Sequence, residues 1–202
     1  MKEPTQGTFA ACKPVEYSQG FILKSFNVEG AGELRFPRST EDALKLRTVC
    51  EEVPVRNGLD ITGNTGVGHW QVDACKVTFP RTRNFLSTVQ SLAVVAVRGL
   101  GLDGERVQLE VRVKKLFLYE TGGPVTFHRD TQKEERIFAT LMLQLPTEGG
   151  YAGVELLVKH GDEEKELNCH NKSKIWFWYT ISFADCLLEL RKIASGTKLC
   201  LA

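Results

Sequence analysis

The second half of the chain is a series of short apolar runs separated by turns. In the first run, residues 107–120, apolar and polar side chains alternate with a period of two, which is typical of a half-buried strand. Their short connections carry turn-forming sequences such as EGGYAG, GDEEK and ASGT. Further strand-like runs occupy residues 136–146, 154–160, 174–183, 187–193 and 198–202. A chain with so many closely spaced strands has a β-rich core, and we expect a sandwich or jelly roll.

Two helices are predicted before this region, which makes the expected fold class α+β. Ser39, followed by Asp42, resembles a helix cap, and apolar side chains then recur at helical spacing as far as Val53. A second apolar stripe at helical spacing comprises Phe85, Val89, Leu92 and Ala96. Residues 1–20 are polar and broken by Pro and Gly, so we expect a loose leader followed by one domain over residues 21–202.

The composition argues against several classes of protein. The formal net charge of +1 gives no basic surface for nucleic acid or for an anionic membrane. No apolar run approaches the roughly 18 residues of a membrane helix, and the N-terminus lacks the apolar core of a signal peptide. The six cysteines include no C-x-x-C pair. We therefore interpret the cysteines as reduced and predict a cytoplasmic location.

An H-x-D triplet, which could supply two metal ligands, occurs twice. Side chains two residues apart on a strand share a face, so His128 and Asp130 could present an imidazole and a carboxylate together. These are two of the three ligands of the 2-His-1-carboxylate site of non-haem iron oxygenases. The second triplet, His160-Gly161-Asp162, lies where a strand pattern meets a charged turn, and we interpret it as part of that turn.

The flanks of the first triplet distinguish it further. The segments LFLYETGGPVTFHRDTQK, FATLMLQLP and GGYAGVELLVKHG resemble the prolyl 4-hydroxylase-like Fe(II)/2-oxoglutarate dioxygenases. The resemblance covers roughly residues 20–202 and is strongest over 107–161. It implies a double-stranded β-helix, which is a jelly roll, with N-terminal helices buttressing one sheet. It also implies Fe(II) and 2-oxoglutarate as cofactors.

The resemblance assigns roles to individual positions. His128 and Asp130 match the first two iron ligands, and Tyr119 matches a tyrosine that contacts 2-oxoglutarate. The third ligand should be a histidine in the segment that here reads FADCLLEL, and the matching position is Leu188. Ten residues later, Lys198 takes the place of a basic residue, usually Arg, that pairs with the far carboxylate of 2-oxoglutarate. Leucine has no lone pair and cannot bind iron, so the metal triad is incomplete.

Four other residues are alternatives for the third ligand. Cys186 would share a strand face with Leu188, but a packing role fits its usual behaviour better. Glu189 should point to the opposite face. His170 belongs to a loop before the aromatic run WFWY, and His69 lies in an irregular Gly-rich stretch, where we expect a surface or substrate-side residue.

Two functions therefore remain open. The first is an Fe(II)/2-oxoglutarate dioxygenase that hydroxylates a peptide, a protein or a small molecule, impaired by the missing ligand. The second is a catalytically inactive relative that retains the scaffold as a binding or interaction module. Neither the composition nor the motifs indicate a nucleic-acid or membrane partner, and the sequence leaves the oligomeric state open.

Overall fold

In the computed structural model, the core of the fold consists of two antiparallel sheets that face each other. It describes the following residues: 8–15, 23–53, 55–57, 60–62, 68–80, 82–122, 126–128, 137–153, 156–168, 174 and 176–202. The main sheet has the strand order β1-β15-β11-β17-β9-β7-β4, with β12 also paired to β17. Its strands are β1 (Ala10–Pro14), β4 (Glu51–Glu52), β7 (His69–Asp73), β9 (Lys115–Glu120), β11 (Ala139–Leu145), β12 (Tyr151–Ala152), β15 (Trp178–Phe183) and β17 (Ser195–Leu201).

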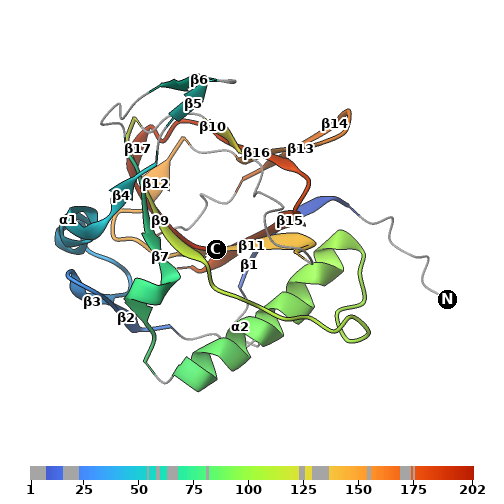
Figure 1. Ribbon diagram of the computed structural model, residues 1–202, viewed down its shortest axis with the longest axis horizontal. Helices are drawn as coiled ribbons and strands as arrows, with labels where there is room; N and C mark the ends of the chain where they lie inside the picture. Colours follow the sequence, from blue (N-terminus) through green and yellow to red (C-terminus); the bar gives the residue numbers. More distant parts are fainter. Residues whose placement is uncertain are drawn as a thin grey trace.

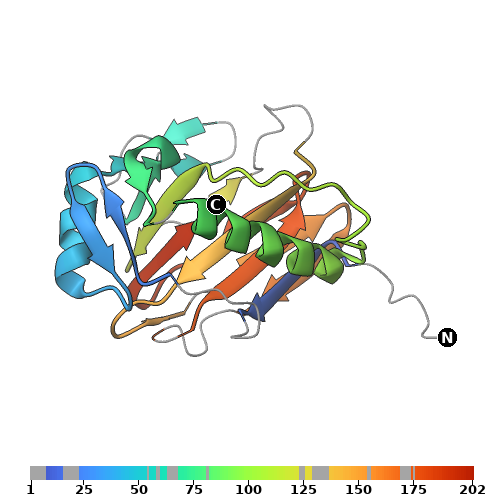
Figure 2. The same ribbon diagram turned by 90° about the horizontal axis from the view of Figure 1, so that it is seen from below.

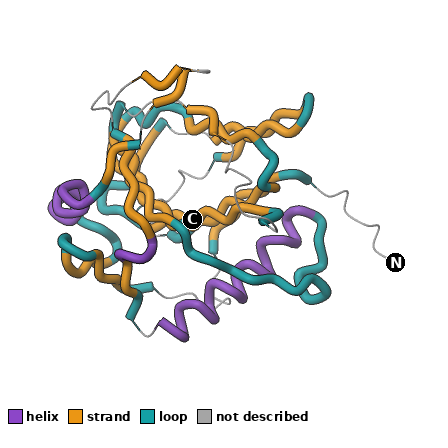
Figure 3. The backbone as a smooth tube through the Cα atoms, in the orientation of Figure 1, coloured by secondary structure: helices purple, strands orange, loops and turns teal. Residues whose placement is uncertain are grey.

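The small sheet completes a jelly roll. Its order is β10-β16-β13-β14, and its strands are β10 (Thr126–His128), β13 (Leu156–His160), β14 (Glu163–Leu167) and β16 (Leu187–Leu190). Along the chain, β9, β11, β15 and β17 lie in the main sheet, whereas β10, β13, β14 and β16, which come between them, lie in the small sheet. The chain thus crosses repeatedly from one sheet to the other, and the strands form a ring when seen end-on (Figures 1 and 3). The predicted β-rich α+β jelly roll is confirmed.

The helices lie outside this ring. Helix α2 (Thr82–Ala96) crosses the main sheet on the side away from the small sheet (Figures 1 and 2). A 3-10 turn, η3 (Val97–Leu100), extends it, and Gly101 ends it with a φ of 78° that favours glycine. Helix α1 (Thr40–Val49) begins as predicted at Ser39, whose side chain accepts a hydrogen bond of 3.1 Å from the Asp42 backbone N–H.

Small sheets and a further 3-10 turn complete the described structure. One sheet has the order β3-β2-β8, and another pairs β5 with β6. Their bounds are β2 (Ser25–Val28), β3 (Gly32–Arg35), β5 (Val55–Asn57), β6 (Asp60–Thr62) and β8 (Val77–Thr78), and the turn η2 covers Ala74–Lys76.

Three local predictions are wrong. Residues 108–114 form no strand, although their burial alternates, because the segment packs beside the core and hydrogen-bonds α2 through Gln90 Nε2 and the Leu109 carbonyl (2.9 Å). Part of the expected leader forms β1, which pairs with β15 at the edge of the main sheet. The predicted turns GDEEK and ASGT contain strand residues, since β14 begins at Glu163 and β17 begins at Ser195.

The prediction that all six cysteines are reduced is also wrong. Cys12 in β1 is disulfide-bonded. Cys50, Cys75, Cys186 and Cys200 are free thiols. In the part of the chain that the structure describes, no helix is long and apolar enough to cross a membrane.

Candidate functional site

The two faces of the main sheet have different chemistry. The outer face is apolar, where Leu118, Leu143 and Leu199 join one buried cluster with Val89 and Leu92 of α2. The inner face contributes to a second cluster that also contains side chains of the small sheet. Most of the buried polar side chains lie at inner-face positions of this sheet, namely His69, Gln144, Thr180, Ser182 and Lys198. Because burying polar groups costs free energy, a polar lining inside a barrel indicates a binding site.

Three of the inner-face residues form one row across neighbouring strands. Tyr119 of β9 is paired directly with Lys198 of β17 on one side and with His69 of β7 on the other. Directly paired residues share a sheet face. The rings of His69 and Tyr119 stack with centroids 4.6 Å apart. Tyr119 and Lys198, which the resemblance assigns to 2-oxoglutarate, are therefore neighbours in space, and His69 is a buried residue rather than a surface one.

Lys198 is a buried cation. Its side chain is 5% exposed, and its ammonium makes no ion pair or hydrogen bond with the residues that the structure describes. The Nζ atom lies 5.5 Å from the centre of the Tyr151 ring, a weak cation–π contact. Burial lowers the pKa of Lys198 below its usual value. An ammonium in this position can bind the carboxylate of a ligand that enters the barrel.

Gln144 and Tyr151 extend the polar lining, and the sequence did not single them out. The Tyr151 hydroxyl donates a hydrogen bond of 2.5 Å to Gln144 Oε1. Burial raises the pKa of the Tyr151 hydroxyl, so the group remains a neutral donor. Gln144 is also paired with Trp178, whose buried Nε1 has no hydrogen-bond partner among the described residues. The one available signal was a glutamine inside the otherwise apolar strand LMLQLP.

A second row crosses the small sheet, opposite the first. Leu188 of β16 is paired with His128 of β10 on one side and with Val158 of β13 on the other. Leu188 is 3% exposed and belongs to the inner cluster. The backbone of β10 ends at His128, the side chain of His128 is not described, and Asp130 lies outside the described residues. The register thus brings the predicted ligand position 128 and the leucine side by side on two strands.

The residues considered above as alternatives for the third ligand lie in different places. Cys186 is buried in the inner cluster, and its Sγ lies 3.8 Å from the carbonyl of Phe9. Burial raises the pKa of this thiol, which disfavours the metal-binding thiolate. Glu189 is only half-buried between two buried leucines, as alternation predicts, and His170 lies outside the described residues. Among the described residues, no group of three His, Cys, Asp or Glu side chains could hold a metal ion.

The second H-x-D triplet forms a turn, as predicted. His160 ends β13, Gly161 has a φ of 59°, and β14 begins two residues later. Val158, rather than the triplet, occupies the row that contains Leu188. The Nε2 atom of His160 instead lies 3.2 Å from the Oδ2 atom of Asp185.

Arg38 supports the start of β17 from outside the barrel. The residue is 1% exposed, and Nη2 donates a hydrogen bond of 2.6 Å to Thr197 Oγ1, next to Lys198. Thr147 Oγ1 donates to the Thr197 carbonyl at 2.9 Å. Burial lowers the pKa of Arg38 to about 10. Thr197 is thus fixed from two sides, which fixes the backbone that carries Lys198.

Comparisons with known proteins give weak likenesses only. No protein-family model and no curated protein matches the chain. Among solved structures, it is similar to an oxidoreductase of the 2OG-Fe(II) oxygenase family from Burkholderia pseudomallei, with 17% identity and a TM-score of 0.47 over 79% of this chain and 74% of that one. It is also similar to a prolyl-4-hydroxylase from Pseudomonas putida, with 16% identity and a TM-score of 0.40 over 66% of this chain and 69% of that one.

A third similar structure is a prolyl hydroxylase from Trichoplax adhaerens, solved in complex with a hypoxia inducible factor oxygen degradation domain peptide fragment. Its identity is 12% and its TM-score 0.44, over 79% of this chain and 72% of that one. All three TM-scores lie below 0.5.

Proposed function

We propose that the chain is a dioxygenase-like jelly-roll protein that binds 2-oxoglutarate inside its barrel and is impaired as a hydroxylase. One observation carries this proposal. Lys198 is a buried ammonium beside Tyr119, without an anionic partner among the described residues. A buried charge is costly unless it is paired, and a dicarboxylate ligand would supply the pair.

The inner-face residues fit 2-oxoglutarate. The Lys198 ammonium would hold one carboxylate, and the Tyr119 phenol on the neighbouring strand would supply a further polar contact. Lysine lacks the two-pronged geometry of arginine, so the carboxylate would be held by a point charge. When bound beside iron, 2-oxoglutarate supplies the electrons for oxygen activation. The chain itself would contribute a buried, positively charged binding position on β17.

The residues fit iron less well. His128 and Asp130 would be the two protein ligands, but Leu188 occupies the paired position at which a third donor is expected. A leucine side chain has no donor atom. Loss even of a supporting residue around a metal costs about 10–100-fold in affinity or activity, and loss of a ligand should cost at least as much.

The second candidate function is a catalytically inactive binding module. The buried position of Leu188 in an apolar cluster with Val158 and Leu190 favours it. In this case the barrel would bind a dicarboxylate without turnover, and a peptide, a protein or a small molecule would be a partner rather than a substrate. A cytoplasmic location, and the absence of nucleic-acid and membrane partners, stay predictions for either function.

A turnover assay tests the proposal. Succinate formation from 2-oxoglutarate, with Fe(II) and ascorbate, is measured for the native chain, for Leu188→His and for His128→Ala. We expect little succinate from the native chain and a gain in Fe(II) affinity in Leu188→His, because the imidazole restores a third donor. The His128→Ala variant is the control for metal held at this site.

Two results would contradict the proposal. A native chain that turns over as fast as Leu188→His, and loses this activity in His128→Ala, is a working dioxygenase with another third ligand. A native chain that shows no binding of 2-oxoglutarate by calorimetry at any pH below 9 does not use Lys198 as an anion site.

A further inference from the structure

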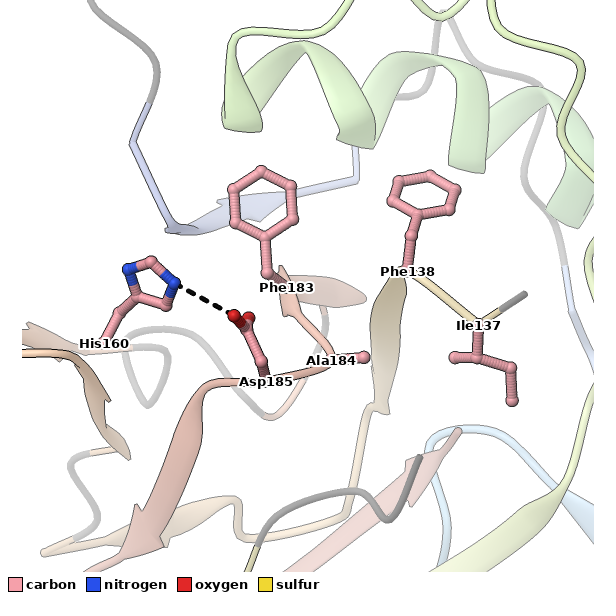
Figure 4. A pocket seen from close by; sticks show the side chains of 6 residues that line it. All are labelled: Ile137, Phe138, His160, Phe183, Ala184 and Asp185. Atoms are coloured by element: carbon pink, nitrogen blue, oxygen red, sulfur yellow. Dashed lines mark hydrogen bonds and ion pairs between the residues drawn. The ribbon is translucent and has the colours of Figure 1, made fainter. Parts of the chain in front are cut away.

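A shallow groove opens beside the turn that joins β15 to β16. Its hollow of about 350 Å³ is lined by Ile137, Phe138, His160, Phe183, Ala184 and Asp185. Figure 4 shows that these side chains come from the start of β11, the end of β13 and the β15–β16 turn. The backbone is fixed there by a hydrogen bond of 2.9 Å from Ala184 N to the Phe138 carbonyl. We call this region the His160 groove.

The His160 groove exposes apolar surface. Four large hydrophobic side chains of the described residues are exposed, and two of them, Ile137 (38%) and Phe138 (42%), are neighbours at this groove. His160 adds an aromatic face, because its ring stacks on Phe9 with centroids 5.6 Å apart and lies 6.4 Å from the Phe183 ring. Adjacent exposed apolar groups rimmed by polar ones are typical of an interaction site.

The groove is also acidic. Asp185 lines it directly, and an adjoining hollow of about 520 Å³, which shares His160 and Phe183, is lined by Asp162 and Glu163. Among the described residues, no lysine or arginine lines either hollow. Lys165, on neighbouring β14, directs its ammonium to Thr8 Oγ1 and the Ala10 carbonyl, at 2.9 and 2.8 Å. Carboxylates without a cation, beside aromatic rings, are complementary to a positively charged side chain with an apolar stem.

We infer that the His160 groove binds an arginine side chain of a peptide or protein partner. A guanidinium stacks on aromatic faces and donates in a planar fork, so it can use the exposed rings and a carboxylate at the same time. Asp185 Oδ2 faces His160 Nε2, which orients the carboxylate and leaves Oδ1 to accept from the guanidinium. The methylene stem of arginine would cover Phe138 and Ile137.

The experiment is an NMR titration that follows the Ile137 and Ala184 methyl signals. The probe is the capped peptide acetyl-Gly-Leu-Arg-Gly-amide, and the matched peptides carry citrulline or glutamate in place of arginine. We expect saturable shifts with the arginine peptide and a dissociation constant at least about fivefold higher with citrulline, because one exposed cation–π contact and ion pair is worth about 1 kcal/mol. The glutamate peptide should bind more weakly still.

Variants locate the binding. Asp185→Asn retains shape and should weaken the arginine peptide at least about fivefold, as should Phe138→Ala. Glu110→Gln, at an exposed acid that pairs with Arg112 elsewhere on the surface, should leave the affinity unchanged. Lys198→Met should also bind the arginine peptide normally, and neither iron nor 2-oxoglutarate is added, so this test is independent of the dicarboxylate site.

Three outcomes would overturn the inference. Equal affinity for the arginine and citrulline peptides would show that charge plays no part. An affinity unchanged by Asp185→Asn and Phe138→Ala would place the peptide elsewhere. Shifts of the same methyl signals on concentrating the protein alone, without peptide, would assign the groove to a second copy of the chain.

Discussion

The two inner walls of the barrel face each other with opposite chemistry. The wall formed by the main sheet buries His69, Gln144 and Lys198. The opposing wall of the small sheet is apolar along β16, with Leu188 and Leu190 as its central residues. In a jelly roll that binds both a metal and an organic acid, each wall would need polar groups. Here the wall that would hold the acid has them, and the wall that would hold the third metal ligand has leucine.

Under the proposed function, the protein retains the half of the site that holds the dicarboxylate. A buried ammonium without a partner costs several kcal/mol, whereas a buried leucine stabilises the fold by about 1.5–3 kcal/mol. The polar wall therefore lowers the stability of the fold, and under the proposed function a bound anion offsets this loss. The apolar wall needs no ligand. Dicarboxylate binding and metal binding, which act together in a dioxygenase, can thus be separated here by variants of single residues.

The largest effect is expected for Lys198→Met. Removing one partner of a buried charge pair costs about 2–5 kcal/mol, so calorimetry should show 2-oxoglutarate binding weakened by at least about 30-fold. Without ligand the same variant should be more stable by about 1–3 kcal/mol in denaturant unfolding, because an uncompensated charge is replaced by an apolar side chain.

A matched control exists for this variant. Lys192 is exposed in the loop before β17, and Lys192→Met should change neither the affinity nor the free energy of unfolding. A Lys198→Met protein that binds 2-oxoglutarate as well as the native chain would show that the polar wall is not an anion site.

Leu188→Ala tests the apolar wall. Truncating a leucine that is 3% exposed should lower the free energy of unfolding by about 2–4 kcal/mol, measured in urea, because the cavity cannot fully collapse. Leu187→Ala, at the half-buried neighbouring position, should cost clearly less. Equal costs for the two variants would mean that β16 does not direct Leu188 into the barrel.

The sequence predicted the two walls unequally. Alternation identified most strands, and the Ser39 cap and both helices follow from local patterns. The strand predicted over Val107–Val113 is wrong because alternating burial is not unique to strands. It also arises when an extended segment packs beside a helix and pairs with no strand. Pairings between distant strands, such as Tyr119 with Lys198, and the Tyr151–Gln144 hydrogen bond depend on register across the sheet, which no local pattern encodes. The His160 groove combines residues from three separate segments of the chain, so no local pattern predicts it.

A smaller, pH-dependent effect sharpens the contrast. Burial lowers the pKa of Lys198 below its usual 10.5, so between the folded value and 10.5 the unfolded chain holds a proton that the folded chain has released. The unfolded state then binds more protons, and the free energy of unfolding rises with pH across that window. Relative to Lys198→Met, the native chain should be less stable at neutral pH and should approach the variant as pH rises toward 10.5.

The loss of the Lys198 proton should also affect the affinity for 2-oxoglutarate. Binding of 2-oxoglutarate should weaken as the pH rises through the folded pKa of Lys198, since the neutral amine no longer attracts a carboxylate. The neighbouring Tyr151 and Cys200 have pKa values raised by burial. Both are present in the native chain and in the variant, so the difference between the two unfolding curves reports mainly Lys198. Parallel curves over the alkaline range would show that the lysine is solvated.

The smallest effect is expected at the edge of the polar wall. Tyr151→Phe removes the hydroxyl that donates to Gln144 Oε1 but keeps the ring that lies 5.5 Å from the Lys198 ammonium. Loss of one neutral hydrogen bond should lower the free energy of unfolding by about 1 kcal/mol, and the affinity for 2-oxoglutarate should change by less than about twofold. Tyr151→Leu, which also removes the ring, should cost more in both measurements. If Tyr151→Phe alone weakened 2-oxoglutarate tenfold, the hydroxyl would itself contact the ligand, and the anion-binding position would extend from β17 onto β12.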